Sequence, residues 1–214
     1  MSALTRSLVA ATAAATATVL VTATAAHAVT VLSVGHVDVV DAEYENGELE
    51  IAVFDEDNEV EYDPADVVFK ALPGSAVAVP DDPAYAFLGA PGDTVWVLPE
   101  VQDPDLLWPG IAAEEVESGV FVNDTLSLRI LKVKGPNGLS VFRTGPAGEP
   151  IILADSEDGL PDAIPLTAGL DEHANWAFEA PGTYRVTVRV TGRLAATGEV
   201  VRSDREVITF KVQD

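Results

Sequence analysis

Residues 173–190 read HANWAFEAPGTYRVTVRV, and this stretch decides the fold class. A polar and aromatic segment leads into a Pro-Gly turn, after which apolar residues alternate with Arg and Thr from Tyr184 to Val190. A two-residue period of this kind is typical of a β-strand with one buried face. We therefore expect an all-β protein in which this strand lies against the core.

Short runs of the same type recur along the chain between clusters of Gly, Pro, Asn and Asp, and no long amphipathic helix interrupts them. Strands are predicted at residues 29–34, 36–44, 48–54, 67–72, 94–98, 125–133, 139–143, 183–191 and 207–212. A short helical turn is expected at 111–116, and long Pro/Gly-rich loops at 80–92 and 99–110. The pattern predicts an antiparallel β-sandwich, immunoglobulin-like or jelly-roll-like, with little helix.

Three of the predicted strands alternate clearly enough to identify residues of the core. The side chains expected to point inward are Leu126, Leu128, Ile130, Tyr184, Val186, Val188, Ile208, Phe210 and Val212. Because the chain has no cysteine, burial rather than disulfide bonds must stabilise the fold. No linker-like tract or repeat divides residues 29–214, which are predicted to form a single β-sandwich domain.

The N-terminal segment has the features of an export signal. Arg6 precedes an apolar run at 8–21, and Ala-His-Ala at 26–28 fits a cleavage site. The run is shorter than the ~20 apolar residues that a membrane span needs. We expect residues 1–28 to be a signal peptide and the mature protein to be secreted without membrane insertion. Residues 210–214 include no apolar tail or sorting motif, so retention at the wall is expected only through a partner.

The charge of the chain restricts its partners. The sequence has 35 acidic and 12 basic residues, a net charge of −23. Such a surface repels phosphate backbones, which argues against nucleic-acid binding, and it attracts cations. The sequence contains no nucleophile elbow, zinc-protease helix motif or phosphate-binding loop, so we expect a non-enzymatic protein.

A β-hairpin follows from Asn46-Gly47, which lies between two alternating runs. This dipeptide favours a two-residue type I′ turn, and such a turn fixes the register of both strands. The expected cross-strand pairs are Tyr44 with Leu49, Ala42 with Ile51 and Val40 with Val53. An apolar face results, in agreement with the predicted register.

The same register predicts a cluster of ligating side chains at the far end of the hairpin. It places Asp38 opposite Asp55 and, where the ladder continues, His36 beside Asp57. Opposed carboxylates destabilise a sheet unless a cation neutralises them. Oxygen ligands alone favour Ca²⁺, whereas His36 together with His173 favours Zn²⁺ or Mn²⁺. The alternative is that the strands diverge and each carboxylate is solvated separately.

Two further features allow more than one interpretation. His173, beside an Asn and a Trp, either joins the metal site from the opposite sheet or bonds a backbone carbonyl. The tryptophans Trp96, Trp108 and Trp176 either stack on sugars or pack the core.

Several separated motifs resemble the actinobacterial surface-anchored, or choice-of-anchor M, domain family. These motifs are GHVDV at 35–39, YENGEL at 44–49, FLGAPG at 87–92, VWVLP at 95–99, LLWPG at 106–110, DGL at 158–160 and HANWAF at 173–178. The resemblance implies an exported wall protein, often encoded beside ABC transport systems of the metal-uptake type. It also implies a histidine two positions before His173, where this chain has Asp171.

The sequence therefore predicts a secreted, non-enzymatic cell-surface binding module that serves as a cation-binding accessory of a metal-uptake ABC transport system. A surface protein or a transporter component is the expected partner. The alternative is a passive wall or adhesion module that binds a protein or a glycan.

Overall fold

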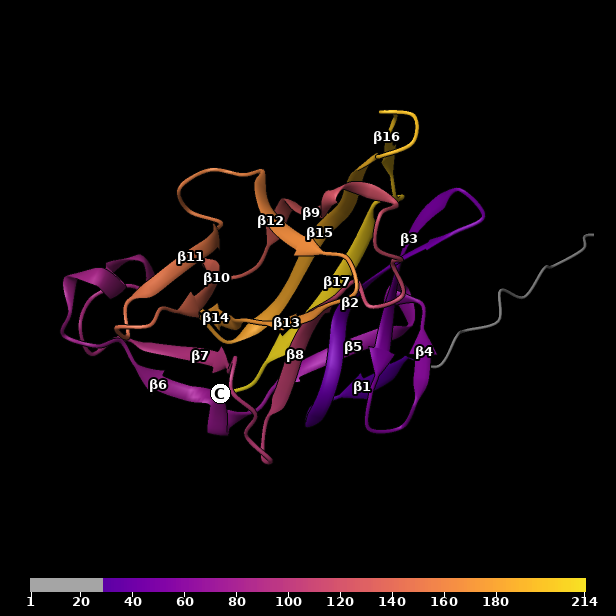
Figure 1. Ribbon diagram of the computed structural model, residues 1–214. Helices are drawn as coiled ribbons and strands as arrows, with labels where there is room; N and C mark the ends of the chain where they lie inside the picture. The colour runs from indigo at the N-terminus through magenta and orange to yellow at the C-terminus, as the bar shows by residue number, and fades with distance from the viewer. Residues whose placement is uncertain (1–28) are drawn as a thin grey trace, which may run out of the picture.

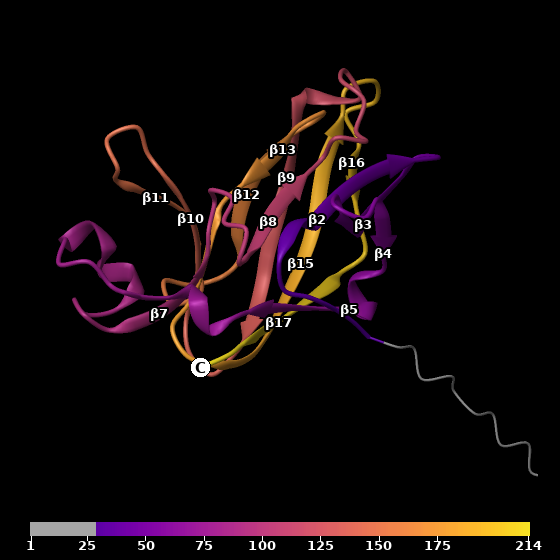
Figure 2. The same cartoon turned by 90° about the horizontal axis from the view of Figure 1, so that it is seen from below.

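The computed structural model describes residues 29–214, and this part of the chain is almost entirely β (Figures 1 and 2). The predicted all-β sandwich is thereby confirmed. The predicted signal peptide, residues 1–28, lies outside the described residues. Within residues 29–214, no helix has the length and apolar character that crossing a membrane requires.

The strands form three sheets. The largest has the order β1 (Thr30–Leu32), β5 (Val67–Ala71), β17 (Glu206–Val212), β15 (Gly182–Leu194), β9 (Phe121–Lys134) and β12 (Asp162–Thr167), with β16 (Val200–Arg202) paired to β15. The second has the order β11 (Pro150–Asp155), β10 (Leu139–Thr144), β14 (Asn175–Phe178), β7 (Thr94–Leu98) and β6 (Ala76–Ala78). The third has the order β13 (Asp171–His173), β8 (Leu107–Ala112), β2 (Gly35–Glu45), β3 (Glu48–Asp55) and β4 (Val60–Tyr62).

Most neighbouring strands are antiparallel, as predicted, but β5 runs parallel to β1 and β17, and β8 runs parallel to β2. In the described part of the chain, three short 3-10 helices connect strands: η1 (Pro64–Asp66), η2 (Pro73–Ser75) and η3 (Pro83–Leu88). η3 occupies part of the segment predicted as the first long loop.

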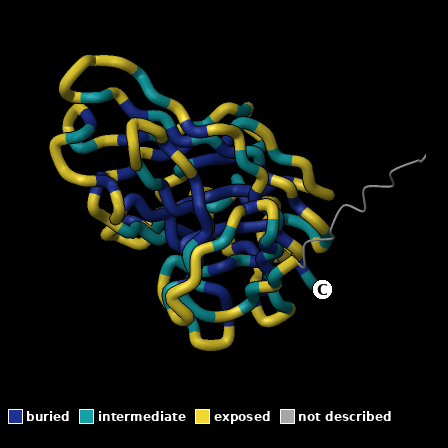
Figure 3. Tube along the Cα trace, turned by 90° about the vertical axis from the view of Figure 1, so that its right-hand side faces the viewer, coloured by how far each residue is buried: buried dark blue, intermediate teal, exposed yellow. Residues whose placement is uncertain are grey.

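Side chains from all three sheets join one main hydrophobic cluster, whose buried segments run through the middle of the molecule in Figure 3. All nine residues predicted to point inward are buried, with exposures of 4% or less. Aromatic rings fill the centre, where Phe210 lies 5.3 Å from Trp176 and 5.1 Å from Phe178 between ring centroids. The alternating pattern in β9, β15 and β17 therefore predicts the buried face of each strand correctly.

The segment around Trp108 differs from its prediction. Residues 107–110, predicted as the end of a loop, belong to β8, and so do the first two residues of the predicted helical turn. The rest of that segment forms a turn closed by the Val116 N–H, which donates to the Ala113 carbonyl. Pro and Gly in this segment signal a loop, but parallel pairing with β2 and burial of Leu107 and Ile111 favour the strand instead.

The predicted hairpin turn is confirmed, since Asn46 and Gly47 both have positive φ, 52° and 88°. The predicted pairs next to the turn, Tyr44 with Leu49 and Ala42 with Ile51, are also confirmed. Farther from the turn the register shifts by one residue, between Asp38 and Asp41. At this shift Val39 and Val40 lie together opposite Val53, so the predicted one-to-one pairing of Val40 with Val53 is not formed.

Candidate metal centre

A β-bulge in β2 changes which carboxylates meet. Asp38 lies opposite Phe54, and Asp55 lies opposite Val37, so the predicted pairing of Asp38 with Asp55 is wrong. Val39 and Val40 together face a single residue of β3, and one extra residue in a strand moves every later side chain to the other face. Both valines are fully buried, because they pack into the core side by side.

The other two carboxylates of the predicted site, those of Asp55 and Asp57 at the rim of the hairpin, have other partners. Asp55 accepts hydrogen bonds from the Asn58 backbone N–H at 3.2 Å and from its side-chain amide at 2.9 and 3.0 Å, which closes the turn after β3. Asp57 Oδ2 accepts the backbone N–H of His36 at 3.1 Å. Asp55 therefore shapes a turn, and Asp57 holds the start of β2 in place.

A different set of ligating groups meets on the β13–β8–β2 part of the third sheet. His36 and Asp38 come from β2, and Asp171 and His173 come from β13, on the other side of β8. The register places both Asp38 and His173 next to Gly110 of β8. Residues in register across neighbouring strands project from the same face, so these side chains gather over a glycine.

The absence of a side chain at Gly110 makes room for this cluster. A Cβ atom there would lie 2.8 Å from Asp171 Oδ1 and would overlap Asp38 Oδ1. Both carboxylates therefore lean over the glycine from opposite sides. No larger residue fits at this position without moving them.

The ligating atoms converge closely. His173 Nε2 lies 2.9 Å and His36 Nε2 lies 3.2 Å from the same atom, Asp171 Oδ2. His36 Nε2 is also 3.7 Å from Asp38 Oδ1. One ligand atom from each of His36, Asp171 and His173 lies within 4.8 Å of the other two, a separation that one bound metal ion can span.

Both ring nitrogens of His173 face acceptors. Nδ1 lies 3.1 Å from the Pro109 carbonyl, to which it donates a proton, while Nε2 faces the Asp171 carboxylate. A neutral ring that donates from Nδ1 directs a lone pair from Nε2 at that negatively charged oxygen. The contact is favourable when the ring is protonated or when a cation lies between the two atoms. Metal-bound histidines commonly donate their second N–H to a carbonyl in this way.

The carboxylates also lack the partners that buried charges need. Asp38 Oδ1 and Asp171 Oδ1 are both buried without a hydrogen-bond partner among the described residues. Burial, together with the negative charge of Asp171, raises the pKa of Asp38 to about 9. Burial also acts to raise the pKa of Asp171, but its hydrogen bonds and charge interactions with His173 and His36 outweigh burial and lower it. A divalent cation would neutralise both carboxylates.

Trp108 supports the two imidazole rings. Its indole stacks on His173 with a centroid separation of 3.7 Å and an interplanar angle of 7°, and it lies 4.4 Å from His36. The indole N–H donates to the Glu100 carbonyl at 2.9 Å, which fixes the ring. Trp96 and Trp176 are 6% and 0% exposed, so they pack the core and do not form a sugar-binding platform.

The donor set consists of two imidazole nitrogens and two carboxylates, which suits Zn²⁺ or Mn²⁺ better than Ca²⁺. The side chains of His36, His173 and Asp171 are 20%, 13% and 15% exposed, and that of Asp38 is 2% exposed. An ion can therefore reach the imidazoles from solvent while Asp38 lies beneath.

The structure brings together three of the five residues predicted for the metal site, His36, Asp38 and His173. It does not bring Asp55 or Asp57 into this group. Asp171 was missed, although the Asp-x-His spacing at 171–173 is the signal that places two ligands on one strand face.

The search for relatives finds no family model and no curated protein that matches the chain. The functional assignment therefore depends on the geometry of the site.

Proposed function

We propose that this protein binds a divalent transition metal, Zn²⁺ or Mn²⁺, through His36, Asp38, Asp171 and His173. The observation that carries the proposal is the convergence of both imidazole Nε2 atoms on Asp171 Oδ2, while His173 Nδ1 is held by a backbone carbonyl. Two buried carboxylate oxygens without partners over Gly110 support it. A cation between these groups satisfies all of them at once.

A binding role, rather than catalysis, fits the number of donors. Four side chains provide a full tetrahedral set, which is the arrangement of zinc sites that hold the ion rather than expose it to a substrate. The net charge of −23 favours the accumulation of cations near the surface. We infer a secreted, non-enzymatic accessory of extracellular metal acquisition, with a surface protein or an ABC-transporter component as the acceptor of the metal.

One observation favours the alternative of a passive wall or adhesion module. β11 is an edge strand of the second sheet, and it exposes Ile151 and Ile152 at 46% and 47%. Exposed apolar edge strands are surfaces on which another chain can pair. This module would show no response to metal ions.

Titration calorimetry of the metal-free protein with Zn²⁺, Mn²⁺ and Ca²⁺ tests the proposal. We expect one high-affinity site for Zn²⁺ or Mn²⁺, weak binding of Ca²⁺, and a rise in melting temperature with the bound ion, because a ligand selective for the folded state stabilises it. His36→Ala and His173→Ala should each remove this site. Equal affinity in the wild type and both variants would refute the assignment, and no binding of any of the three ions would favour the adhesion module.

A further inference from the structure

A basic surface covers one side of the largest sheet. In β17, β15 and β9, which lie side by side in Figure 1, buried core residues alternate with residues that point away from the core. β5 continues the same alternation next to β17. We call this side of the four strands the outward face. Seven of the 12 Lys and Arg residues of the chain lie on it: Lys70, Arg129, Lys132, Lys134, Arg185, Arg189 and Lys211.

The outward face differs in charge from the rest of the molecule. Where these four strands pair with one another, none of its positions holds Asp or Glu, although the chain has 35 acidic residues. Threonines occupy several of the remaining positions, among them Thr183, Thr187 and Thr209. The surface therefore consists mainly of cations and hydroxyl groups.

The register of the sheet sets these cations directly opposite one another. Three cross-strand pairs join two basic residues: Lys211 with Lys70, Arg185 with Lys134, and Arg189 with Arg129. Like charges in opposed positions destabilise a sheet. None of these six side chains forms a salt bridge with a carboxylate of the described residues. An anion lying across the pairs would remove this repulsion.

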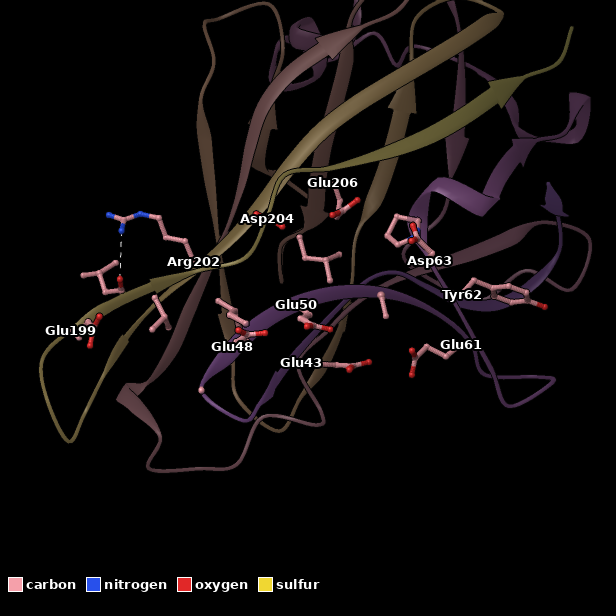
Figure 4. Close-up of a pocket in the computed structure, with 17 residues that line it drawn as sticks. Glu43, Glu48, Glu50, Glu61, Tyr62, Asp63, Glu199, Arg202, Asp204 and Glu206 are labelled. Carbon is pink, nitrogen blue, oxygen red and sulfur yellow. Dashed lines mark hydrogen bonds between the residues drawn. The ribbon is translucent and has the colours of Figure 1, made fainter. Parts of the chain in front are cut away.

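The acidic residues gather elsewhere. A groove with a volume of about 630 Å³ between the β3–β4 region and β16 with the start of β17 is lined by eight carboxylates and one guanidinium (Figure 4). Glu206 of β17 lines this groove and pairs with the buried Val188, so it lies on the inner side of the sheet. Burial, together with the negative charge of Glu43 and Glu115, raises the pKa of Asp41 in β2 to about 7. The two signs of charge are thus separated.

This separation lets the outward face act as a cationic surface in spite of the net charge of −23. At physiological ionic strength the Debye length is about 8 Å, so exposed charges farther apart than this are largely screened from each other. A ligand on the outward face therefore meets the Lys and Arg side chains more strongly than the distant carboxylates.

The spacing of the three pairs indicates an extended ligand. Neighbouring strands are about 4.8 Å apart, so the four strands from β5 to β9 span about 14 Å, and the distance along β15 from Arg185 to Arg189 is about 13 Å. A single phosphate contacts one pair, whereas a chain of phosphates can cross all three. Lys, Arg and Thr are side chains that commonly donate to phosphate oxygens.

The same face distinguishes among polyanions. Its paired outward positions carry no aromatic ring. Proteins that bind single-stranded nucleic acid stack bases on aromatic rings, and helices that lie on membranes commonly insert Trp or Phe. A flat sheet face also does not enter the major groove of a duplex as a helix or a two-stranded ribbon does. A phosphate chain without bases fits best.

We propose that the outward face of β5, β17, β15 and β9 binds a linear polyanion whose repeating units carry phosphate groups. Each phosphate accepts charge-assisted hydrogen bonds from a cross-strand pair of cations, and threonine hydroxyls between the pairs donate to it as well. The surface is separate from the metal centre and does not depend on it.

Titration calorimetry of the metal-free protein with inorganic polyphosphate tests the proposal. We expect binding that weakens with salt, because phosphate contacts release counterions. The double variant Lys134→Gln, Arg185→Gln removes one exposed pair and should bind about tenfold more weakly. The slope of log affinity against log salt should fall by about 1.4, at about 0.7 for each lost contact.

The matched control is Gln102→Glu, Arg143→Gln, which lowers the net charge by the same two units outside the outward face. Gln102 is exposed in the loop between β7 and β8, and Arg143 belongs to β10 of the second sheet. This variant should keep the wild-type affinity for polyphosphate. His173→Ala should keep it too, because it changes the metal site alone.

Three results would overturn the proposal. The first is that polyphosphate does not bind, and the second is that the control loses as much affinity as the double variant. The third is that single-stranded DNA or vesicles of phosphatidylglycerol bind more tightly than polyphosphate at equal phosphate concentration. Self-association that the double variant abolishes, without binding of polyphosphate, would assign the face to a second copy of the chain instead.

Discussion

His173 Nε2 lies 2.9 Å from Oδ2 of Asp171, two residues earlier on the same short strand. Residues i and i+2 of a strand share one face, so β13 presents both groups to the space over β8. The strand has three residues, and within residues 29–214 it pairs with β8 alone. A metal ion held from both sides would therefore connect β13 to β2 across β8.

Replacing a proposed ligand and a rim carboxylate should have different effects on metal binding. We expect Asp38→Asn to weaken Zn²⁺ affinity by at least about tenfold, or about 1.4 kcal/mol, because a charged ligand is lost. Asp55→Asn should leave Zn²⁺ affinity unchanged, since Asp55 bonds Asn58 instead. Calorimetric titration of both variants checks this. An equal loss of Zn²⁺ affinity in both variants would show that Asp55 also belongs to the metal site.

The glycine at the centre of the site should not tolerate a methyl group. Gly110→Ala places a Cβ against Asp38 and 2.8 Å from Asp171 Oδ1, so we expect a loss of about 1–3 kcal/mol in unfolding free energy and a loss of metal binding. Gly74→Ala is the control, because its Cβ would meet Leu106 at an ordinary 3.8 Å. Denaturant unfolding measures the first effect. A Gly110→Ala protein that binds Zn²⁺ normally would show that the two carboxylates are not ligands.

Trp108 should act as a positioning residue. Trp108→Ala removes the ring that stacks on His173, so we expect Zn²⁺ affinity to fall about 10-fold or more, as it does when groups that orient metal ligands are lost. Trp108→Phe restores an aromatic face and should recover most of the affinity. If Phe and Ala lower the affinity equally, stacking does not orient the imidazole.

Asp41 should make the wild type less stable as the pH rises. Its pKa is about 7 in the folded protein and 3.8 for the free group, so between these values the folded state binds more protons than the unfolded state. The contribution of Asp41 to the unfolding free energy therefore falls from about pH 4 to about pH 7 and is constant above pH 7. Asp41→Asn removes this dependence. The unfolding free energy of the variant, relative to that of the wild type, should therefore rise over that interval by at most about 4 kcal/mol.

Urea unfolding at several pH values measures this difference. The exposed control Glu117→Gln should follow the wild type at every pH. A constant difference between Asp41→Asn and the wild type would contradict the raised pKa.

Local sequence signals were sufficient where one residue pattern determines the backbone. Asn46-Gly47 specified the turn, and the alternation from Tyr184 to Val190 identified the buried face of β15. The bulge was different, because Val39 and Val40 are equally apolar and nothing in their spacing shows that both are buried. The resulting shift of one residue separated Asp38 from Asp55.

The rest of the site required tertiary information. β8 carries turn-forming residues and is held as a strand by its neighbours on both sides. β13 is too short for a periodic pattern to be detected. Asp171 and His36 are 135 positions apart in the chain, and they meet because β8 pairs with β2 on one side and with β13 on the other.

Anomalous diffraction at the zinc absorption edge, from crystals of the protein grown with Zn²⁺, tests the metal site most directly. We expect one strong peak over Gly110, at about 2.0–2.1 Å from Nε2 of both His36 and His173 and at about 2.0–2.2 Å from a carboxylate oxygen of Asp171 and Asp38. A crystal saturated with Zn²⁺ that shows no peak there, or shows its peak beside Asp55 and Asp57, would contradict the account.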